Sequence, residues 1–141
     1  MKDGKLVVAQ IGCGAFAEHQ DLRNFTRNPK CILKWCCDIS AERAAAMAGK
    51  FGVPHHTADF MQIVNDPEVD MIKVATSHEA HLPIIEAAAA RHKHIFCEKP
   101  MAMHEDEAFA IIRAVRRGGI KFCVDLNRRM APSMQALRKH W

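Results

Sequence analysis

The chain has 141 residues, of which 49% are hydrophobic and 26% charged, and its net charge is +4. This composition is ordinary for a globular protein, and the length is sufficient for one domain with a buried core. It excludes a membrane-spanning segment, because no apolar run approaches the ~20 residues that a transmembrane helix needs. The short, glycine-interrupted apolar stretch near the N-terminus is a poor signal peptide, so we expect a cytoplasmic protein with no membrane partner.

The basic residues and the cysteines indicate no specialised class. Basic residues are in excess between positions 113 and 139, but no nucleic-acid-binding motif accompanies them, so we expect no nucleic-acid partner. The six cysteines include no C-x-x-C pair, which argues against a zinc site. Several lie within or beside apolar runs, namely Cys36, Cys37, Cys97 and Cys123. We therefore expect reduced, buried thiols that pack as small hydrophobic side chains.

Apolar runs and helical patterns alternate along the whole chain. The pattern predicts strands at 5–11, 31–38, 55–57, 69–77, 93–97 and 120–124, and helices at 17–28, 40–52, 59–66, 82–92, 105–117 and from 132 onward. In the second helix, Ser40 is a suitable N-cap and Gly52 a suitable left-handed C-terminal stop. Strands that alternate with helices predict an α/β fold, here a Rossmann-type doubly wound, mainly parallel six-stranded sheet with helices on both faces. We expect a single dinucleotide-binding domain over 1–141.

Lys73 does not fit this pattern, because it falls inside the predicted strand 69–77, where both faces of the sheet should be covered. Either the stem of the side chain carries the ammonium to the end of the sheet, or the strand lies near an edge. The sequence leaves both possibilities open.

A glycine turn follows the first predicted strand and opens the first predicted helix. It has the form G-x-G-x-x-A, with Gly12, Gly14 and Ala17. The first glycine permits a tight turn, the second lets a pyrophosphate approach the backbone, and the small third residue lets helix and strand pack closely. The helix N-terminus offers N–H groups and partial positive charge to phosphates.

An acidic residue strengthens the case for a dinucleotide. Asp38 ends the second predicted strand, about 20 residues beyond the turn, where an acid accepts hydrogen bonds from the adenosine ribose. Because a carboxylate repels a 2′-phosphate, NAD is favoured over NADP. Two alternatives remain: Asp38 could cap the next helix beside Ser40, or the chain could be an S-adenosylmethionine-dependent methyltransferase, which also has a glycine turn and an acid.

Residues 96–100, "FCEKP", separate these alternatives. Glu98-Lys99-Pro100 after a fifth strand resembles the signature of the Gfo/Idh/MocA oxidoreductases. "FGVP", "DPEVDMIKVATS", "AAAARHKHIFCEKPMAM" and "NRRMAP" resemble other parts of that family's pattern, in its order, from about Lys5 to Pro132. The resemblance implies an NAD(P)-dependent dehydrogenase that transfers hydride to or from a sugar, inositol or related polyol.

The resemblance also implies a set of site residues. The backbone of Cys13, Gly14, Ala15, Phe16 and Ala17 would bind the pyrophosphate, next to Gly12, and Asp38 and Ile39 would bind the adenosine. Thr76, Ser77 and His81 would line the loop after the fourth strand. Glu98 would lie near the nicotinamide ribose, Lys99 would be the catalytic proton-transfer residue, Pro100 would follow a cis peptide bond, and Arg129 would lie near the cofactor.

The chain departs from the family pattern at several positions. Ser77 replaces a usual proline, His104 a usual Ser or Thr cap, and Asp125 a common glycine. His78 and His81 are spaced like two metal ligands, but no third ligand accompanies them, so we predict no metal.

The resemblance implies that the family's second domain, which forms the substrate wall, is absent after about residue 130. One hypothesis is that the chain is the cofactor domain of a longer dehydrogenase, inactive alone and able to oligomerise through the missing domain. The other is a stand-alone, non-catalytic NAD(P)-binding or sensor module.

Overall fold

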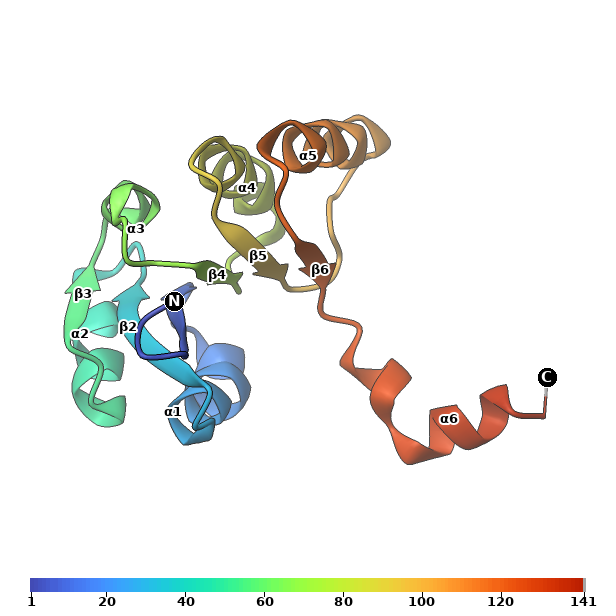
Figure 1. The fold of residues 1–141 in the computed structure, drawn as a ribbon, viewed down its shortest axis with the longest axis horizontal. Coiled ribbons are helices and arrows are strands. Elements are labelled where there is room, and N and C mark those ends of the chain that lie inside the picture. The colour runs from blue at the N-terminus through green and yellow to red at the C-terminus, as the bar shows by residue number, and fades with distance from the viewer. Residues whose placement is uncertain (141) are drawn as a thin grey trace.

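A computed structural model describes residues 1–140 and contains one six-stranded sheet (Figure 1). The strands are β1 Leu6–Ile11, β2 Cys31–Cys37, β3 His55–Thr57, β4 Met71–Val74, β5 His94–Cys97 and β6 Phe122–Val124. They lie in the order β3-β2-β1-β4-β5-β6, and every neighbouring pair is parallel. This order, in which the chain reverses its direction of winding at β1, is that of a doubly wound dinucleotide-binding fold. The predicted fold class is therefore confirmed.

The helices also follow the prediction. They are α1 Arg23–Arg27, α2 Ala41–Phe51, α3 Phe60–Asn65, α4 His81–Ala90, α5 Glu105–Gly118 and α6 Pro132–Arg138, with a π-helical stretch at Ala17–Leu22 and 3₁₀ turns at His78–Ala80 and Asn127–Met130. Ser40 caps α2 by accepting a hydrogen bond from the backbone of Arg43, and Gly52 ends it with φ of 66°. The largest difference is β4, which is shorter than the predicted strand 69–77. Trp141, predicted to continue the last helix, lies outside the described residues.

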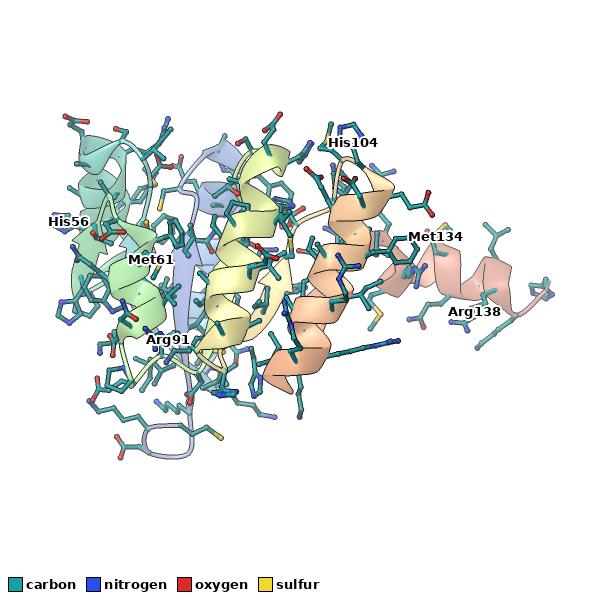
Figure 2. All side chains as sticks on the ribbon, turned by 90° about the horizontal axis from the view of Figure 1, so that it is seen from above. His56, Met61, Arg91, His104, Met134 and Arg138 are labelled. Carbon is teal, nitrogen blue, oxygen red and sulfur yellow. The ribbon has the colours of Figure 1, made fainter. Side chains whose placement is uncertain are left out.

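Two apolar layers pack against the sheet, one on each face. Helices α3, α4 and α5 cover one face, and α1 and α2 cover the other on the side of β1 and β2 (Figure 1). In Figure 2, Arg91, which follows the last residue of α4, and His104, which precedes the first residue of α5, lie at opposite ends of the α3–α5 layer. The end of one helix is thus far from the start of the other, so α4 and α5 run parallel. Alternation along each strand divides the side chains between the layers: Ile72 and Val74 of β4 join the α3–α5 layer, and Met71 joins the other.

The C-terminal segment leaves the sheet after β6. Helix α6 extends away from the two layers (Figures 1 and 2), and its Met134 and Leu137 are exposed. Because β6 is an edge strand, Cys123 is exposed, so the expectation that this thiol is buried was wrong. The other three thiols singled out from the sequence are buried and free. Among the described residues, every helix is too short or too polar to cross a bilayer.

Candidate functional site

A groove of about 390 Å³ lies where the carboxyl ends of β1, β2 and β4 meet. Parallel strands of a doubly wound sheet direct their carboxyl ends to one edge, and ligands of such folds bind there, at the reversal of strand order. Six of the predicted cofactor-binding residues line the groove: Gly12, Gly14, Asp38, Ile39, Thr76 and Ser77.

The glycine turn forms one wall of this groove. Gly12 has φ of 89°, and a Cβ there would lie 2.3 Å from the backbone oxygen of Ala75, so only glycine fits. Gly14 differs, because a Cβ there would meet nothing within 4 Å. The space over Gly14 is thus open for a ligand to approach the backbone. The helix that follows begins directly after the turn, with Glu18 N–H donating to the Gly14 carbonyl.

Asp38 ties the glycine turn to the start of α2. Its buried carboxylate accepts hydrogen bonds from the backbone N–H of Cys13 at 2.9 Å and of Ser40 at 3.0 Å, and from the guanidinium of Arg43 at 2.9 Å. Burial alone would raise the pKa of Asp38, but these donors, Arg43 foremost, lower it below its usual value. The side chain therefore stays ionised and faces the groove. Beside it, Ile39 is 94% exposed and offers the groove an apolar surface.

Sequence reasoning did not single out Arg43. This residue lies in the first turn of α2 and lines the groove. An available signal was the spacing from Asp38, because a residue three positions after an N-cap lies over the chain that precedes the helix. Arg43 is the one cationic side chain among the described residues that line the groove, and it is paired with Asp38.

The turn after β5 lies beside the loop after β4. The Lys99–Pro100 peptide bond is cis, as predicted. His81, fully buried at the start of α4, has Nδ1 3.1 Å from the carbonyl oxygen of Pro100, and so connects the two loops. Burial lowers the pKa of His81 despite that hydrogen bond, so the ring is neutral at pH 7. His81 is not among the residues that line the groove, and its buried Nε2 has no hydrogen-bond partner within residues 1–140, so its role in cofactor binding stays a prediction.

The remaining predicted residues lie outside the groove. Cys13 and Ala17 are buried, and the Cys13 N–H is engaged by Asp38. Ala15 and Phe16 form the exposed start of the helix after the glycine turn. Lys99 is exposed, whereas Glu98 is buried. Arg129 lies in the 3₁₀ turn before α6 and lines a separate hollow with Met134, Leu137 and Arg138.

Lys73 is the feature that the sequence left unexplained. It lies in β4, between β1 and β5, so the edge position was wrong. Its stem does carry the ammonium to residues that follow β5 and β6 at the end of the sheet, but the side chain is 0% exposed and the ammonium meets carboxylates there instead of solvent. Its Nζ lies 2.7 Å from Asp125, 2.8 Å from Glu98 and 3.4 Å from Asp21, and 4.1 Å from the centre of the Phe96 ring. Although burial lowers the pKa of a lysine, these carboxylates raise that of Lys73, which therefore remains charged.

The three carboxylates could by themselves surround a cation, since one oxygen of each lies within 4.8 Å of the others. The Lys73 ammonium already supplies a positive charge to all three. We call these four residues, Lys73, Asp21, Glu98 and Asp125, the buried ion cluster. The prediction that the protein binds no metal stays a prediction.

Asp21 gives the buried ion cluster a pH dependence that can be measured. Burial raises its pKa from 3.8 to about 6, against the attraction of Lys73. The folded state therefore binds more protons than the unfolded state between about pH 4 and pH 6, and stability falls as the pH rises through this window. Asn at this position imitates the protonated form. We expect Asp21→Asn to match the wild type at pH 4 and to be more stable at pH 7, by on the order of 2 kcal/mol.

Urea unfolding of both proteins at several pH values between 4 and 8 measures this difference. A stability difference that is constant across the window, or that favours the wild type at pH 7, would contradict the raised pKa.

The strand order, the glycine turn and the acid at the end of β2 define a nucleotide-binding Rossmann domain. A family model described as an oxidoreductase family with an NAD-binding Rossmann fold matches residues 6–126. The chain belongs to this family, the Gfo/Idh/MocA oxidoreductases. The resemblance seen in the sequence is thus confirmed, and the methyltransferase alternative was wrong.

Relatives and solved structures agree with this assignment. The chain is 31% identical over 134 residues to the uncharacterized oxidoreductase YrbE of Bacillus subtilis, covering 95% of this chain and 39% of that protein. It is 34% identical to levoglucosan dehydrogenase of Pseudarthrobacter phenanthrenivorans, covering 77% of this chain and 28% of that protein. A solved levoglucosan dehydrogenase with NADH and levoglucosan aligns with a TM-score of 0.83 and 30% identity, over 96% of this chain and 39% of the other.

The chain therefore spans less than two fifths of the length of these relatives. The family model covers the glycine turn, the sheet and the turn after β5, which form the nucleotide-binding part of the fold.

Proposed function

We propose that the chain is the cofactor-binding domain of an NAD-dependent dehydrogenase that acts on a sugar, inositol or related polyol. The observation that carries the cofactor assignment is the groove beside Gly14, where open space over the backbone lies next to the ionised carboxylate of Asp38. The pyrophosphate would lie over Gly14 and the helix start that follows it. The adenosine ribose would bind Asp38, and the adenine would pack on the exposed side chain of Ile39.

Asp38 and Arg43 set the choice between NAD and NADP. The carboxylate of Asp38 would repel a 2′-phosphate. Arg43, the cation that could attract this phosphate, is already engaged in an ion pair with Asp38 at 2.9 Å. We expect the wild type to bind NADH at least tenfold more tightly than NADPH. Asp38→Ala should weaken NADH binding and free Arg43 to pair with the 2′-phosphate, which relaxes the preference. Cofactor fluorescence titrations of the purified chain measure both affinities.

Arg43→Met is the matched control for this test. It removes the cation but leaves the hydrogen bonds from Cys13 and Ser40 to Asp38, so NADH should stay preferred and NADPH should bind no better. Equal affinities in the wild type, or an unchanged preference in Asp38→Ala, would overturn the role given to Asp38.

Catalysis would use the turn that follows β5. We propose that Lys99 contacts the reacting hydroxyl and takes part in proton transfer, because it is exposed at the carboxyl end of β5, beside the loop that carries Thr76 and Ser77. Hydride would then pass between the carbon of that hydroxyl and the nicotinamide. The exposed apolar side chains of α6 support the proposal that the whole protein continues into a part that packs near this edge and completes the substrate site.

The activity is tested on a longer form of the protein, with NAD⁺ reduction followed at 340 nm over a panel of inositols, sugars and other polyols. Lys99→Ala should lower kcat by at least a hundredfold while NADH binding changes less than threefold. Turnover that survives this substitution would show that Lys99 is not the catalytic residue. Oligomerisation through the further part of the protein stays a prediction.

A further inference from the structure

Lys73 lies in a position where a charge is costly. Its partners in register on the neighbouring strands are Gln10 of β1 and Phe96 of β5, so its side chain rises from the middle of the sheet, on the face opposite α3–α5. A buried ammonium loses its hydration and is retained only where hydrogen-bonded carboxylates compensate. An apolar side chain, like those of its neighbours Ile72 and Val74, would fill a strand position with no such cost. The charge of Lys73 therefore calls for a role beyond packing.

The contact that gives it such a role is the one to Glu98. One carboxylate oxygen of Glu98 accepts a hydrogen bond from Lys73 at 2.8 Å, and the other accepts one from the backbone N–H of Lys99 at 3.3 Å. The carboxylate is thus fixed between a buried cation and the backbone of the turn. Glu98 directly follows β5, next to the end of β4, so it lies at the ligand-binding edge of the sheet and is the member of the buried ion cluster closest in sequence to Lys99.

We propose that Lys73 is a positioning residue for the cofactor site, whose ammonium orients the Glu98 carboxylate toward the nicotinamide half of the dinucleotide. The inference rests on the proposed function, in which the cofactor crosses the carboxyl ends of β4 and β5. Lys73 itself is 0% exposed, so it would act through Glu98 and not by direct contact with the ligand.

Asp21 and Asp125 keep this arrangement charged and in place. Asp21 comes from the helix after the glycine turn and Asp125 from the residue that follows β6, so Lys73 joins three segments around the end of β5. With all four groups ionised the cluster has an excess of negative charge. Burial raises the pKa of Asp21, with a smaller contribution from Glu98 and Asp125, so proton uptake by Asp21 would relieve this excess. One oxygen of Asp21 has no hydrogen-bond partner within residues 1–140. In this arrangement the two aspartates would balance the charge of Lys73, and Glu98, which directly follows β5, would be the member that acts on the cofactor.

The experiment uses a background in which Lys73 and Glu98 form a neutral pair. Asp21→Asn together with Asp125→Asn provides it, since both substitutions keep the shape of the side chain and remove one negative charge each. Into this background Lys73→Met and Glu98→Gln are introduced singly and together, so that no variant contains more than one unpaired charge. NADH affinity is measured by fluorescence titration, and thermal unfolding of each variant confirms that it is folded at the temperature of the titration.

We expect Lys73→Met and Glu98→Gln each to weaken NADH binding about tenfold, and the double variant to be no weaker than Glu98→Gln alone. This non-additivity is the signature of a residue that acts through another, and a role in stability alone does not produce it. The proposal is wrong if Lys73→Met leaves the affinity unchanged, if Glu98→Gln does so, or if the two losses multiply to about a hundredfold. It is also wrong if the Asn background itself binds NADH more than tenfold less tightly than the wild type.

The same titrations separate this inference from the proposed function. A wild-type chain that binds neither NADH nor NADPH overturns both. A wild type that binds NADH, with variants that follow one of the contradicting patterns, overturns the positioning role of Lys73 and leaves the cofactor assignment intact.

Discussion

Gly12→Ala should destabilise the domain by about 2–5 kcal/mol. Two independent effects add at this position. The φ of 89° is one that an L-residue adopts at a cost, and the new Cβ would lie 2.3 Å from the oxygen of Ala75, which belongs to the backbone and cannot rotate away. The clash would push the glycine turn away from the end of β4 and disturb the groove on both sides. Urea unfolding followed by circular dichroism measures the loss.

Gly14→Ala is the matched control, two residues along the same turn. A Cβ there meets nothing within 4 Å, so stability should change by less than about 0.5 kcal/mol. The methyl group would instead occupy the open space proposed for the pyrophosphate. We therefore expect NADH affinity to fall at least tenfold in a protein that unfolds like the wild type. If Gly14→Ala binds NADH normally, the pyrophosphate does not cross the turn at this glycine.

Lys73→Met in the wild-type background should destabilise the domain by about 3–5 kcal/mol. Methionine matches the stem of the lysine, so the substitution tests the charge rather than the packing. Without the ammonium, the carboxylates of Asp21, Glu98 and Asp125 would face one another in a buried site with no cation. The loss should shrink in acid, because protonation of the carboxylates removes their repulsion. Chemical unfolding at pH 5 and pH 7 measures both effects.

Lys50→Met is the control for removing a lysine from an ion pair at the surface. Lys50 pairs with Glu18, and the Lys50 side chain is 57% exposed, so water replaces the lost partner and stability should change little. If Lys73→Met were as stable as the wild type or more so, the buried ion cluster would be a cost to the fold that an apolar side chain removes.

Local patterns were sufficient to predict most of the fold. The Ser40 cap, the Gly52 stop and the alternation of apolar runs with helices depend on neighbours in sequence, and the structure confirms them. Strand β4 was predicted too long at both ends, because Val69 and Asp70 precede it and residues 75–77 form a loop that lines the groove. Apolar character indicates burial, and Val69 is buried without belonging to the strand.

The buried ion cluster could not be predicted, because its members are far apart in the sequence. Lys73 and Asp125 are 52 residues apart, and Lys73 and Glu98 are 25 apart. Two of the members appeared separately as anomalies: Lys73 as a lysine within a strand, and Asp125 as an aspartate at a common glycine position. Only the strand order, which places β4 beside β5 and β5 beside β6, brings them together. Arg43 is a different case, because it is only five residues from Asp38 and its spacing from the N-cap of α2 was an available local signal.

The Asp38 carboxylate accepts three hydrogen bonds within the protein, and these affect how a ligand would bind. Two backbone N–H groups and one guanidinium already fix its orientation, so the turn and the start of α2 have their working arrangement before any nucleotide arrives. Binding of the adenosine half of the dinucleotide would then require little ordering of the chain, and most of its contact energy would appear as affinity. A carboxylate can accept about four hydrogen bonds, so a ribose hydroxyl can add to this network without dismantling it. The adenosine half is in this sense a rigid anchor, and any large closing movement of the whole protein would take place at the nicotinamide end.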